Sequence, residues 1–376
     1  MIHVTGITMD LRVTYHLTGG EARDAAARAR DIALEQTVEL AAETVPDGAQ
    51  RVVGRVESVE PLGQGGRWRA VIAFDPAVAG EDVTQLVNLL FGNISLKPGI
   101  RIADVDWPPA LLRALGGPRL GITGLRAACG VEQRPLLCTV LKPLGLSAAD
   151  LARRCHQFAL GGMDVVKDDH SLADQHYAPF LERVERCQEA VVRANGVTGG
   201  GTLYFPNVTA EPGAALERAR FAREAGCRGV LVNALPAGLG LIREIAAATD
   251  LAVMAHSALA GVFFHADHGI APEVLLGDLF RLAGGDAVIY PNVGGRFTFS
   301  AATCAAINER LRRPLGAVRP AFPAPGGGID AARVPAWIDR YGPDTMFLVG
   351  GSLYAQPDLT AAARRLADAV ARHPYG

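Results

Sequence analysis

The sequence contains very few lysines. Lys97, Lys142 and Lys167 are the only ones among its 37 basic residues, and all the others are arginine. A guanidinium stays protonated, whereas an amine can lose its proton and react. Lys142 and Lys167 each end a short apolar run, which favours a chemical role for both. Alternatively, a drift in base composition has replaced most lysines by arginine and left a few at the surface. For Lys97 in SLKPG the two explanations are equally suitable.

Several other features are missing as well. No C-x-x-C pair occurs, so the scattered cysteines favour buried, reduced thiols over disulfides or zinc ligands. The net charge is only −2, no uninterrupted apolar run could span a bilayer, and the start MIHVTGITMD lacks a basic region followed by an apolar core. We therefore expect a cytoplasmic protein with neither nucleic acid nor a membrane as partner. The cysteines are Cys129, Cys138, Cys155, Cys187, Cys227 and Cys304.

The first part of the chain, up to about Gly117, mixes strand and helix signals. Strand-like stretches and helical stretches follow one another without a strict alternation, which is typical of an α+β domain with a mainly antiparallel sheet. We predict such a domain, ferredoxin-like, at residues 1–120. The strand-like stretches are 12–17, 51–59 and 67–74, and the helical ones are 21–40 and 81–91.

The second part alternates short apolar runs with amphipathic helices. Eight such runs in about 240 residues are what a (β/α)8 TIM barrel requires, and we predict one at residues 121–376. A doubly wound open sheet is the rival fold, but no G-x-G-x-x-G follows the first strand. The runs are 136–143, 162–169, 201–209, 229–235, 251–258, 287–295, 319–328 and 345–352.

Polar residues follow the predicted barrel strands, and barrel active sites lie at the carboxyl ends of these strands. The segment Asp168–His170 offers two carboxylates and an imidazole, which could hold a divalent cation such as Mg²⁺. A solvated loop or a helix cap is the alternative for that segment. The residues expected to meet at one mouth are Lys142, Lys167, Asp169, His170, Asn207, Asn233, His256, Ser257, Asn292, Arg296, Gly326–Gly328 and Gly350–Ser352.

Two glycine runs, PGGGID and VGGSLY, end the last two predicted strands. Backbone amides at these places could bind a phosphate without a charged side chain. Tight turns that need positive φ are the alternative.

Together these motifs resemble the large subunit of ribulose bisphosphate carboxylase/oxygenase (RuBisCO). The likeness rests on GPRLGITGLRAACGVEQRPLLCTVLKPLGLS, GGMDVVKDDH, LAGGDAVIYPNVGG, PGGGID and LVGGSLY, in family order, and on GNISLKPGIRIADVDWPP in the first domain. It covers nearly the whole chain. The sequence looks most like the RuBisCO-like proteins that do not fix CO₂.

The resemblance implies a role for each matching residue. Lys167 would take up CO₂ as a carbamate and bind Mg²⁺ together with Asp169, with His170 at the position of the third ligand. Lys142 would transfer protons, and His256 matches the histidine that closes the fifth strand. Residues matching the phosphate-binding glycines are Gly327, Gly328, Gly350 and Gly351. Glu35 and Asn93 match residues that a neighbouring subunit lends to the active site, which implies a homodimer with shared sites, or a higher oligomer.

Four departures from the family pattern limit the chemistry. His170 replaces a metal carboxylate, and Arg296 replaces the loop lysine that holds CO₂ in carboxylases. Ser257 and Ala260 replace an arginine and a histidine expected near a second phosphate, and the motif with a second lysine is contracted to LKPLGLS. We therefore do not expect carboxylation. We expect a substrate with a single phosphate.

The predicted activity is a Mg²⁺-dependent formation of an enediolate from a phosphorylated keto sugar or keto sugar acid. The sequence looks most like the branched-sugar (apiose) catabolic group, which implies a lyase or C–C hydrolase acting on 3-oxo-isoapionate 4-phosphate. Arg296 could clamp the substrate carboxylate. The alternatives are a methionine-salvage enolase or isomerase acting on a methylthio-sugar phosphate, and a non-catalytic scaffold that binds a phosphorylated metabolite.

Overall fold

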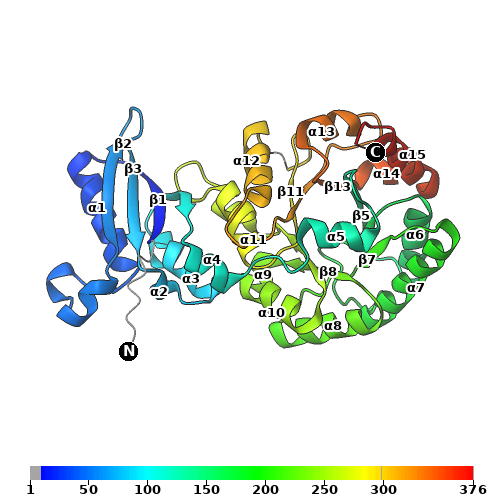
Figure 1. Cartoon of the computed structure of the whole chain (residues 1–376), viewed down its shortest axis with the longest axis horizontal. Coiled ribbons are helices and arrows are strands. Elements are labelled where there is room, and N and C mark those ends of the chain that lie inside the picture. The colour runs from blue at the N-terminus through cyan, green and yellow to red at the C-terminus, as the bar shows by residue number, and fades with distance from the viewer. Residues whose placement is uncertain (1–9, 298, 376) are drawn as a thin grey trace. The chain divides into compact units, whose positions relative to one another are not determined.

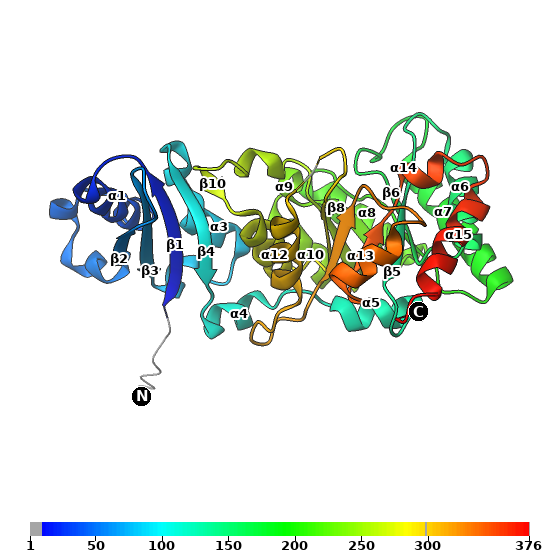
Figure 2. The ribbon, with the colours of Figure 1, turned by 90° about the horizontal axis from the view of Figure 1, so that it is seen from above.

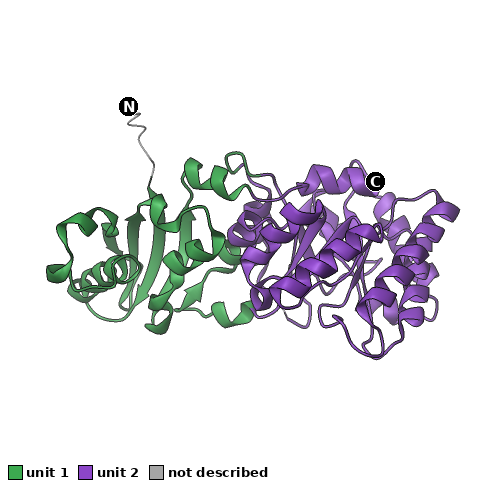
Figure 3. Ribbon diagram, turned by 90° about the horizontal axis from the view of Figure 1, so that it is seen from below, with its two compact units in different colours: residues 1–116, 260–275, 315–318 green, residues 117–259, 276–314, 319–376 purple. Residues whose placement is uncertain are grey.

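The computed structural model describes residues 10–297 and 299–375. The chain divides into two compact units, coloured separately in Figure 3. Unit 1 comprises the chain up to Gly116 with the segments 260–275 and 315–318, and unit 2 comprises the segments 117–259 and 276–314 and the chain from Arg319 onward. Unit 1 holds a mainly antiparallel sheet and unit 2 a sheet of eight parallel strands, so the predicted fold class is confirmed.

Unit 1 is built on a five-stranded sheet with the order β10-β4-β1-β3-β2. Residues of β1 alternate between buried and half-exposed, as expected for a sheet with one face on a core. The buried Tyr15 donates a hydrogen bond to the carbonyl of Leu90 (2.9 Å), which fastens helix α3 to the sheet. The strands are β1 (Leu11–Thr18), β2 (Arg55–Pro61), β3 (Arg67–Phe74), β4 (Ile100–Asp106) and β10 (Gly269–Ile270).

The sequence pattern does not predict β10. This two-residue strand pairs in parallel with β4, and Ala271 N–H donates to the carbonyl of Ile102 (2.9 Å). Two residues carry no periodicity, so only the partner strand defines β10.

The helices of unit 1 are α1 (Ala22–Glu35), α2 (Pro76–Ala79), α3 (Val83–Phe91) and α4 (Pro109–Leu115). Helix α1 ends earlier than the helical stretch 21–40 predicts. Gln36 follows it, and its side-chain amide donates to the carbonyls of Asn88 (2.8 Å) and Leu89 (2.7 Å). Glu39 then has a positive φ of 54°, which is incompatible with a continuing helix.

Unit 2 is a barrel whose strand order is β7-β6-β5-β13-β12-β11-β9-β8. The ring closes between β7 and β8, where Val208 N–H donates to the carbonyl of Leu231 (3.0 Å) and Leu231 N–H to that of Pro206 (2.8 Å). The strands are β5 (Leu136–Leu141), β6 (Val165–Asp168), β7 (Leu203–Phe205), β8 (Gly229–Asn233), β9 (Ala252–His256), β11 (Ala287–Pro291), β12 (Phe322–Gly326) and β13 (Met346–Leu348).

Helices surround these strands, as Figures 1 and 2 show. The amphipathic helices expected between the apolar runs are present, and α6, α8 and α13 are among them. Helix α6 begins after Ser147, whose hydroxyl accepts from Asp150 N–H (3.1 Å) as an N-cap. The helices are α5 (Gly121–Cys129), α6 (Ala148–Leu160), α7 (Phe180–Thr198), α8 (Pro212–Glu224), α9 (Ala234–Ala237), α10 (Leu239–Thr249), α11 (Phe280–Leu282), α12 (Ala301–Arg312), α13 (Val334–Tyr341), α14 (Gly351–Tyr354) and α15 (Leu359–Ala371).

The barrel core explains why the strand signals are apolar runs. All six residues of β5 are buried, because one face of a barrel strand meets the interior and the other meets the helices. Leu136, Phe205 and Met254 belong to one core cluster. All six cysteines are buried and unpaired, as predicted. Within the described part of the chain, no helix combines the length and the apolar character needed to cross a membrane.

Candidate active site

Four of the predicted site residues meet where β5, β6 and β9 end. Lys142 follows β5, and its Nζ lies 3.5 Å from Oδ2 of Asp169, which follows β6. His170 Nδ1 lies 3.2 Å from Asp169 Oδ1. The imidazole of His170 stacks on that of His256, the last residue of β9, with 4.4 Å between centroids and 4° between planes. We therefore treat this cluster as the candidate active site.

Lys167 is the buried amine beside this cluster. It is 2% exposed, and its Nζ donates to the carbonyl of Asp168 at 3.1 Å. Burial lowers the pKa of Lys167, and the neighbouring Cys138 and Asp169 only partly offset that effect. Compared with an exposed lysine, Lys167 therefore loses its proton more easily, and the deprotonated amine is the form that can act as a base or take up CO₂.

Asp169 is an ionised carboxylate. Burial alone would raise its pKa, but the hydrogen bonds from His170 and from Ser171 N–H (3.0 Å), together with the charge of Lys167, hold the pKa well below its usual range. Its side chain is 11% exposed. Asp169 can therefore offer charged oxygens to a cation at neutral pH.

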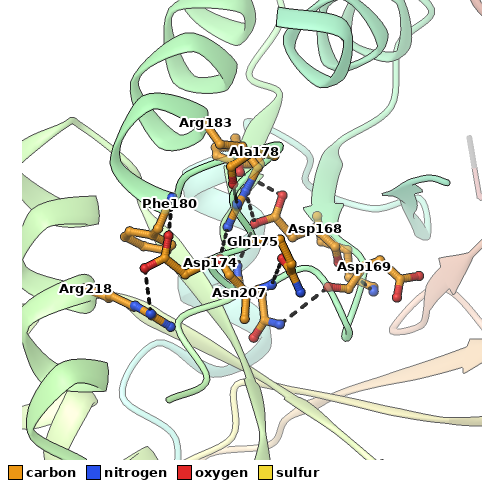
Figure 4. A network of polar contacts seen from close by, with 12 residues as sticks. Asp168, Asp169, Asp174, Gln175, Ala178, Phe180, Arg183, Asn207 and Arg218 are labelled. Carbon is orange, nitrogen blue, oxygen red and sulfur yellow. Dashed lines mark hydrogen bonds and ion pairs between the residues drawn. The ribbon is translucent and has the colours of Figure 1, made fainter. Parts of the chain in front are cut away.

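The carboxylate of Asp168 has different partners from that of its neighbour Asp169, the aspartate that the resemblance matches to a metal ligand. The Asp168 carboxylate is fully buried and is bound by Arg183 Nε (3.1 Å), Tyr204 Oη (2.8 Å) and Asn207 N–H (2.9 Å). In Figure 4 it points toward Arg183, while the carboxylate of Asp169 points away from this network. Asp168 is therefore a structural residue, and only Asp169 remains for chemistry.

Arg183 on α7 orders the loop that follows β6. It donates to the carbonyls of Ala178 (2.6 Å) and Ala173 (2.6 Å) as well as to Asp168. The sequence interpretation missed this residue. A single arginine at a position that should face the core of an amphipathic helix is the signal that could have indicated it, because buried charges are normally paired.

Two further residues hold the backbone of Lys142. The hydroxyl of Tyr354 accepts from Lys142 N–H (3.0 Å) and donates to the carbonyl of Val140 (2.9 Å). Arg154 donates to the carbonyl of Lys142 (2.9 Å). Their sequence context carries no signal for this role, because α6 and α14 bring them to β5 only in the folded chain.

His256 is neutral and its tautomer follows from one hydrogen bond. Burial, and then the charge of Lys167, lowers the pKa of His256 well below its ordinary value. Its Nδ1 accepts from Ala258 N–H at 3.0 Å, so the proton lies on Nε2. His256 can therefore donate a hydrogen bond without bringing a charge.

Two asparagines position the backbone of His170. Asn207 Nδ2 (2.9 Å) and Asn233 Nδ2 (2.8 Å) both donate to the carbonyl of His170. Among the described residues, Oδ1 of Asn233 is buried with no hydrogen-bond partner. This acceptor at the end of β8 could bind a substrate hydroxyl.

The glycine runs form tight turns beside the strand ends. Gly327 and Gly328 have φ values of 102° and 69°, which only glycine adopts without strain. A Cβ at Gly327 would lie 3.1 Å from the Cα of Gly295, so the two turns approach closely. Ser352 Oγ donates to the carbonyl of Ile329 (2.8 Å), which joins the turn after β12 to the one after β13. Phosphate binding by Gly327, Gly328, Gly350 and Gly351 stays a prediction.

The structure does not bring Arg296 into the cluster by any hydrogen bond or ion pair of the described residues. It is exposed on the loop after β11, and its guanidinium lies 5.7 Å from the ring centre of Phe297. A role for Arg296 in catalysis also stays a prediction.

Glu35 and Asn93 lie together in unit 1. Asn93 Nδ2 donates to Glu35 Oε1 (3.1 Å), and Lys97 Nζ contacts Glu35 Oε2 (3.1 Å) and Asp31 Oδ2 (2.8 Å). The hydrogen bonds from Lys97 and Asn93 hold the pKa of Glu35 below its usual range. Lys97 is therefore a structural partner of Glu35.

A divalent cation fits this site only under one condition. In the part of the chain that the structure describes, no group of three histidine, cysteine or acidic side chains is arranged to hold a metal. Asp169 and His170 supply two donors, and a carbamate on Lys167 would supply a third. The donor set is thus complete only if the amine of Lys167 takes up CO₂.

Known proteins resemble this chain over nearly all of its length. Residues 121–372 match the family model of the ribulose bisphosphate carboxylase large chain, catalytic domain. Ribulose bisphosphate carboxylase-like protein 1 of Rhodopseudomonas palustris is 41% identical, covering 96% of this chain and 97% of that protein. A crystal structure of a Rubisco-like protein from the same species has a TM-score of 0.89 and 40% identity, covering 97% of this chain and 99% of that one.

Two further relatives have named activities. A 5-methylthioribulose-1-phosphate isomerase of Rhodospirillum rubrum is 40% identical, covering 94% of this chain and 93% of that protein. A 2,3-diketo-5-methylthiopentyl-1-phosphate enolase of Geobacillus kaustophilus is 33% identical, covering 81% and 78% respectively.

Proposed function

Because this chain belongs to the ribulose bisphosphate carboxylase large-chain family, as one of its RuBisCO-like proteins, we propose that it is an enolase or isomerase of a phosphorylated keto sugar. A methylthio-pentulose phosphate of methionine salvage is the substrate we favour. Relatives with that type of substrate support this choice. The sequence alone favoured 3-oxo-isoapionate 4-phosphate and gave the methylthio-sugar phosphate as an alternative, so this choice of substrate differs from the first prediction. The observation that carries the proposal is a buried Lys167 with a lowered pKa, beside an Asp169 whose carboxylate lies 3.5 Å from the amino group of Lys142.

Enolisation requires a base near the acidic C–H and hydrogen-bond donors or cations near the oxygen where negative charge develops. Lys167, as the amine or as its carbamate, is the base. His256 offers Nε2–H to the developing oxyanion. The Lys142 amino group, held 3.5 Å from Asp169, returns a proton to the carbon skeleton.

The chemistry that a divalent cation supplies when bound by Asp169, His170 and a carbamate on Lys167 is polarisation of the substrate carbonyl. The family typically uses Mg²⁺, and we propose a divalent cation here as well. The turns at Gly327–Gly328 and Gly350–Gly351 would bind the single phosphate through backbone amides.

Exchange of the acidic proton tests the proposal directly. The protein is incubated in D₂O with a divalent cation, bicarbonate and 5-methylthioribulose 1-phosphate, and ¹H and ³¹P NMR follow deuterium uptake and product formation. Lys167→Met should abolish both. Arg365→Met, which removes an exposed cation on α15, is the matched control and should leave both unchanged. No exchange by the wild-type protein on this substrate would count against the proposal.

One observation favours a second candidate. Among the described residues, Arg296 has no carboxylate partner, so it is free to clamp a carboxylate of the substrate. Decarboxylation or cleavage of 3-oxo-isoapionate 4-phosphate would use such a clamp. Release of labelled CO₂, or of two shorter acids, from the carboxyl-labelled compound would support this second activity.

We also propose a homodimer with shared active sites, in which Glu35 and Asn93 of one subunit serve the barrel of the other. Mixed dimers of Glu35→Gln and Lys167→Met chains test it. Each single variant should be inactive, and random mixing should restore roughly a quarter of the wild-type activity, because half of the dimers then carry one intact site. Absence of any recovery in verified mixed dimers would argue against shared sites.

A further inference from the structure

A basic pocket of about 450 Å³ lies between α12 and α13, apart from the candidate active site. Its charged residues are three arginines and one glutamate, so its lining is positive. The lining residues are Ala305, Asn308, Glu309, Arg312, Arg313, Arg340 and Tyr341.

Two of these arginines lack a carboxylate partner in the part of the chain that the structure describes. Among the residues that the structure describes, Arg312 donates only to backbone carbonyls, those of Asn308 (3.2 Å), Tyr341 and Asp344 (3.5 Å). The guanidinium of Arg340 lies above the rings of Trp337 (5.9 Å) and Tyr341 (6.0 Å). Among the described residues, the guanidinium charges of Arg312 and Arg340 are therefore not paired with a carboxylate, and Glu309 is the one acidic residue of the lining.

Hydrogen-bond donors at the pocket are also unused. Asn308 is 2% exposed, and its Oδ1 accepts from Tyr290 Oη (2.5 Å), but its Nδ2 is buried without an acceptor among the described residues. The same holds for Nε of Arg313, whose terminal nitrogen pairs with Asp278 (3.2 Å). Buried donors rarely stay without an acceptor in folded proteins, so a ligand rich in acceptor oxygens would complete this pocket.

We propose that this pocket binds a phosphate group, either of inorganic phosphate or of a phosphate monoester, as an anion site separate from the glycine turns. Phosphate offers several acceptor oxygens and at least one negative charge, which matches unpaired guanidinium groups better than any neutral ligand does. Two hydrogen bonds also connect the pocket to a glycine turn. Tyr341 Oη donates to Asn292 Oδ1 (2.7 Å), and Asn292 Nδ2 donates to the carbonyl of Gly327 (3.2 Å).

Trp337 provides a local signal for binding. It is the only tryptophan after Gly117, and its ring stacks on that of Tyr341 with 5.5 Å between centroids. The full-length protein is titrated with potassium phosphate at constant ionic strength while tryptophan fluorescence is recorded. We expect a saturable change in fluorescence that Trp337→Phe abolishes.

Arg340 is the residue to replace, because it is exposed and its guanidinium forms no hydrogen bond or ion pair with the described residues beyond its contacts with two aromatic rings. Arg340→Glu should weaken phosphate binding by about tenfold or more, since a cation is exchanged for a repelling anion, and Arg340→Lys should retain most of it. Arg365→Glu makes the same change of net charge on α15 and should bind phosphate like the wild type.

The variant Gly351→Asp distinguishes binding in this pocket from binding at the predicted phosphate site of the glycine turns. It places a carboxylate in that predicted site, and a Cβ at Gly351 would meet no atom within 4 Å. The proposal requires that the Trp337 signal survives in Gly351→Asp and is lost in Arg340→Glu. An unchanged titration of Arg340→Glu, loss of the signal in Gly351→Asp, or no saturable response in the wild type would each overturn it. Parallel titrations with ribose 5-phosphate show whether inorganic phosphate or a phosphate monoester binds more tightly.

Discussion

Replacing Asp168 by asparagine should destabilise the barrel much more than the same replacement of the adjacent Asp169. Asp168 and Arg183 are both fully buried, at 0% side-chain exposure. Removal of one partner from a buried ion pair costs about 3–5 kcal/mol, because the other charge stays buried without compensation. Asp169 pairs with Lys142, which is 43% exposed, so solvent screens that interaction and its loss costs about 1 kcal/mol or less.

The difference of about 2–4 kcal/mol corresponds to a melting temperature that is roughly 4–16 °C lower for Asp168→Asn than for Asp169→Asn. Thermal unfolding followed by Trp337 fluorescence measures it within unit 2. Turnover should show the opposite pattern: Asp169→Asn folds but is inactive, whereas folded Asp168→Asn keeps measurable activity.

A double replacement tests the physical cause. In Asp168→Asn with Arg183→Met no unpaired charge is left, so the melting temperature should recover part of the loss. Equal melting temperatures for the two asparagine variants, or a double variant less stable than Asp168→Asn alone, would refute the assignment of Asp168 as the buried partner of Arg183.

Three further predictions concern individual side chains of the site. Because the pKa of His256 is lowered, the unfolded chain binds a proton that the folded chain does not. The free energy of unfolding should therefore fall by up to about 1.4 kcal/mol per pH unit as the pH drops below about 6.5, and His256→Gln should flatten a plot of melting temperature against pH in that range. Lys167→Met should raise the melting temperature in calorimetry while abolishing proton exchange in NMR, because a buried amine with a lowered pKa destabilises the fold below its ordinary pKa of 10.5; a lower melting temperature with intact exchange would contradict this. A nitrogen donor at His170 favours transition metals, so His170→Glu should shift the preference from Mn²⁺ toward Mg²⁺ by about tenfold, as measured by competition in Mn²⁺ electron paramagnetic resonance; an unchanged ratio would show that His170 is not a ligand.

The barrel could be predicted because its physical requirement is local. Strands such as β5 are buried on both faces, so each needs a run of apolar residues, and the polar residue that ends the run marks the mouth. Strand β10 could not be predicted, since two residues joined to β4 leave no pattern of their own. The end of α1 depends on contacts of Gln36 with α3, which are equally non-local.

The sequence also predicted part of the candidate site. Of the residues expected at one mouth, Lys142, Asp169, His170 and His256 do meet, and Lys167 is buried beside them. The distinct role of Asp168 was not predictable, because adjacent aspartates look alike until α7 packs Arg183 against one of them.

The sequence by itself determined where reactive groups occur: a lysine-poor chain keeps two lysines at strand ends, next to carboxylate and imidazole. Only the tertiary structure decided their charge states, because a pKa depends on burial and on neighbouring charges that arrive from other elements. The same reason applies to the pocket between α12 and α13. Its arginines are ordinary in the sequence, and only the packing of the two helices places Arg312 and Arg340 in one pocket without a carboxylate partner among the described residues.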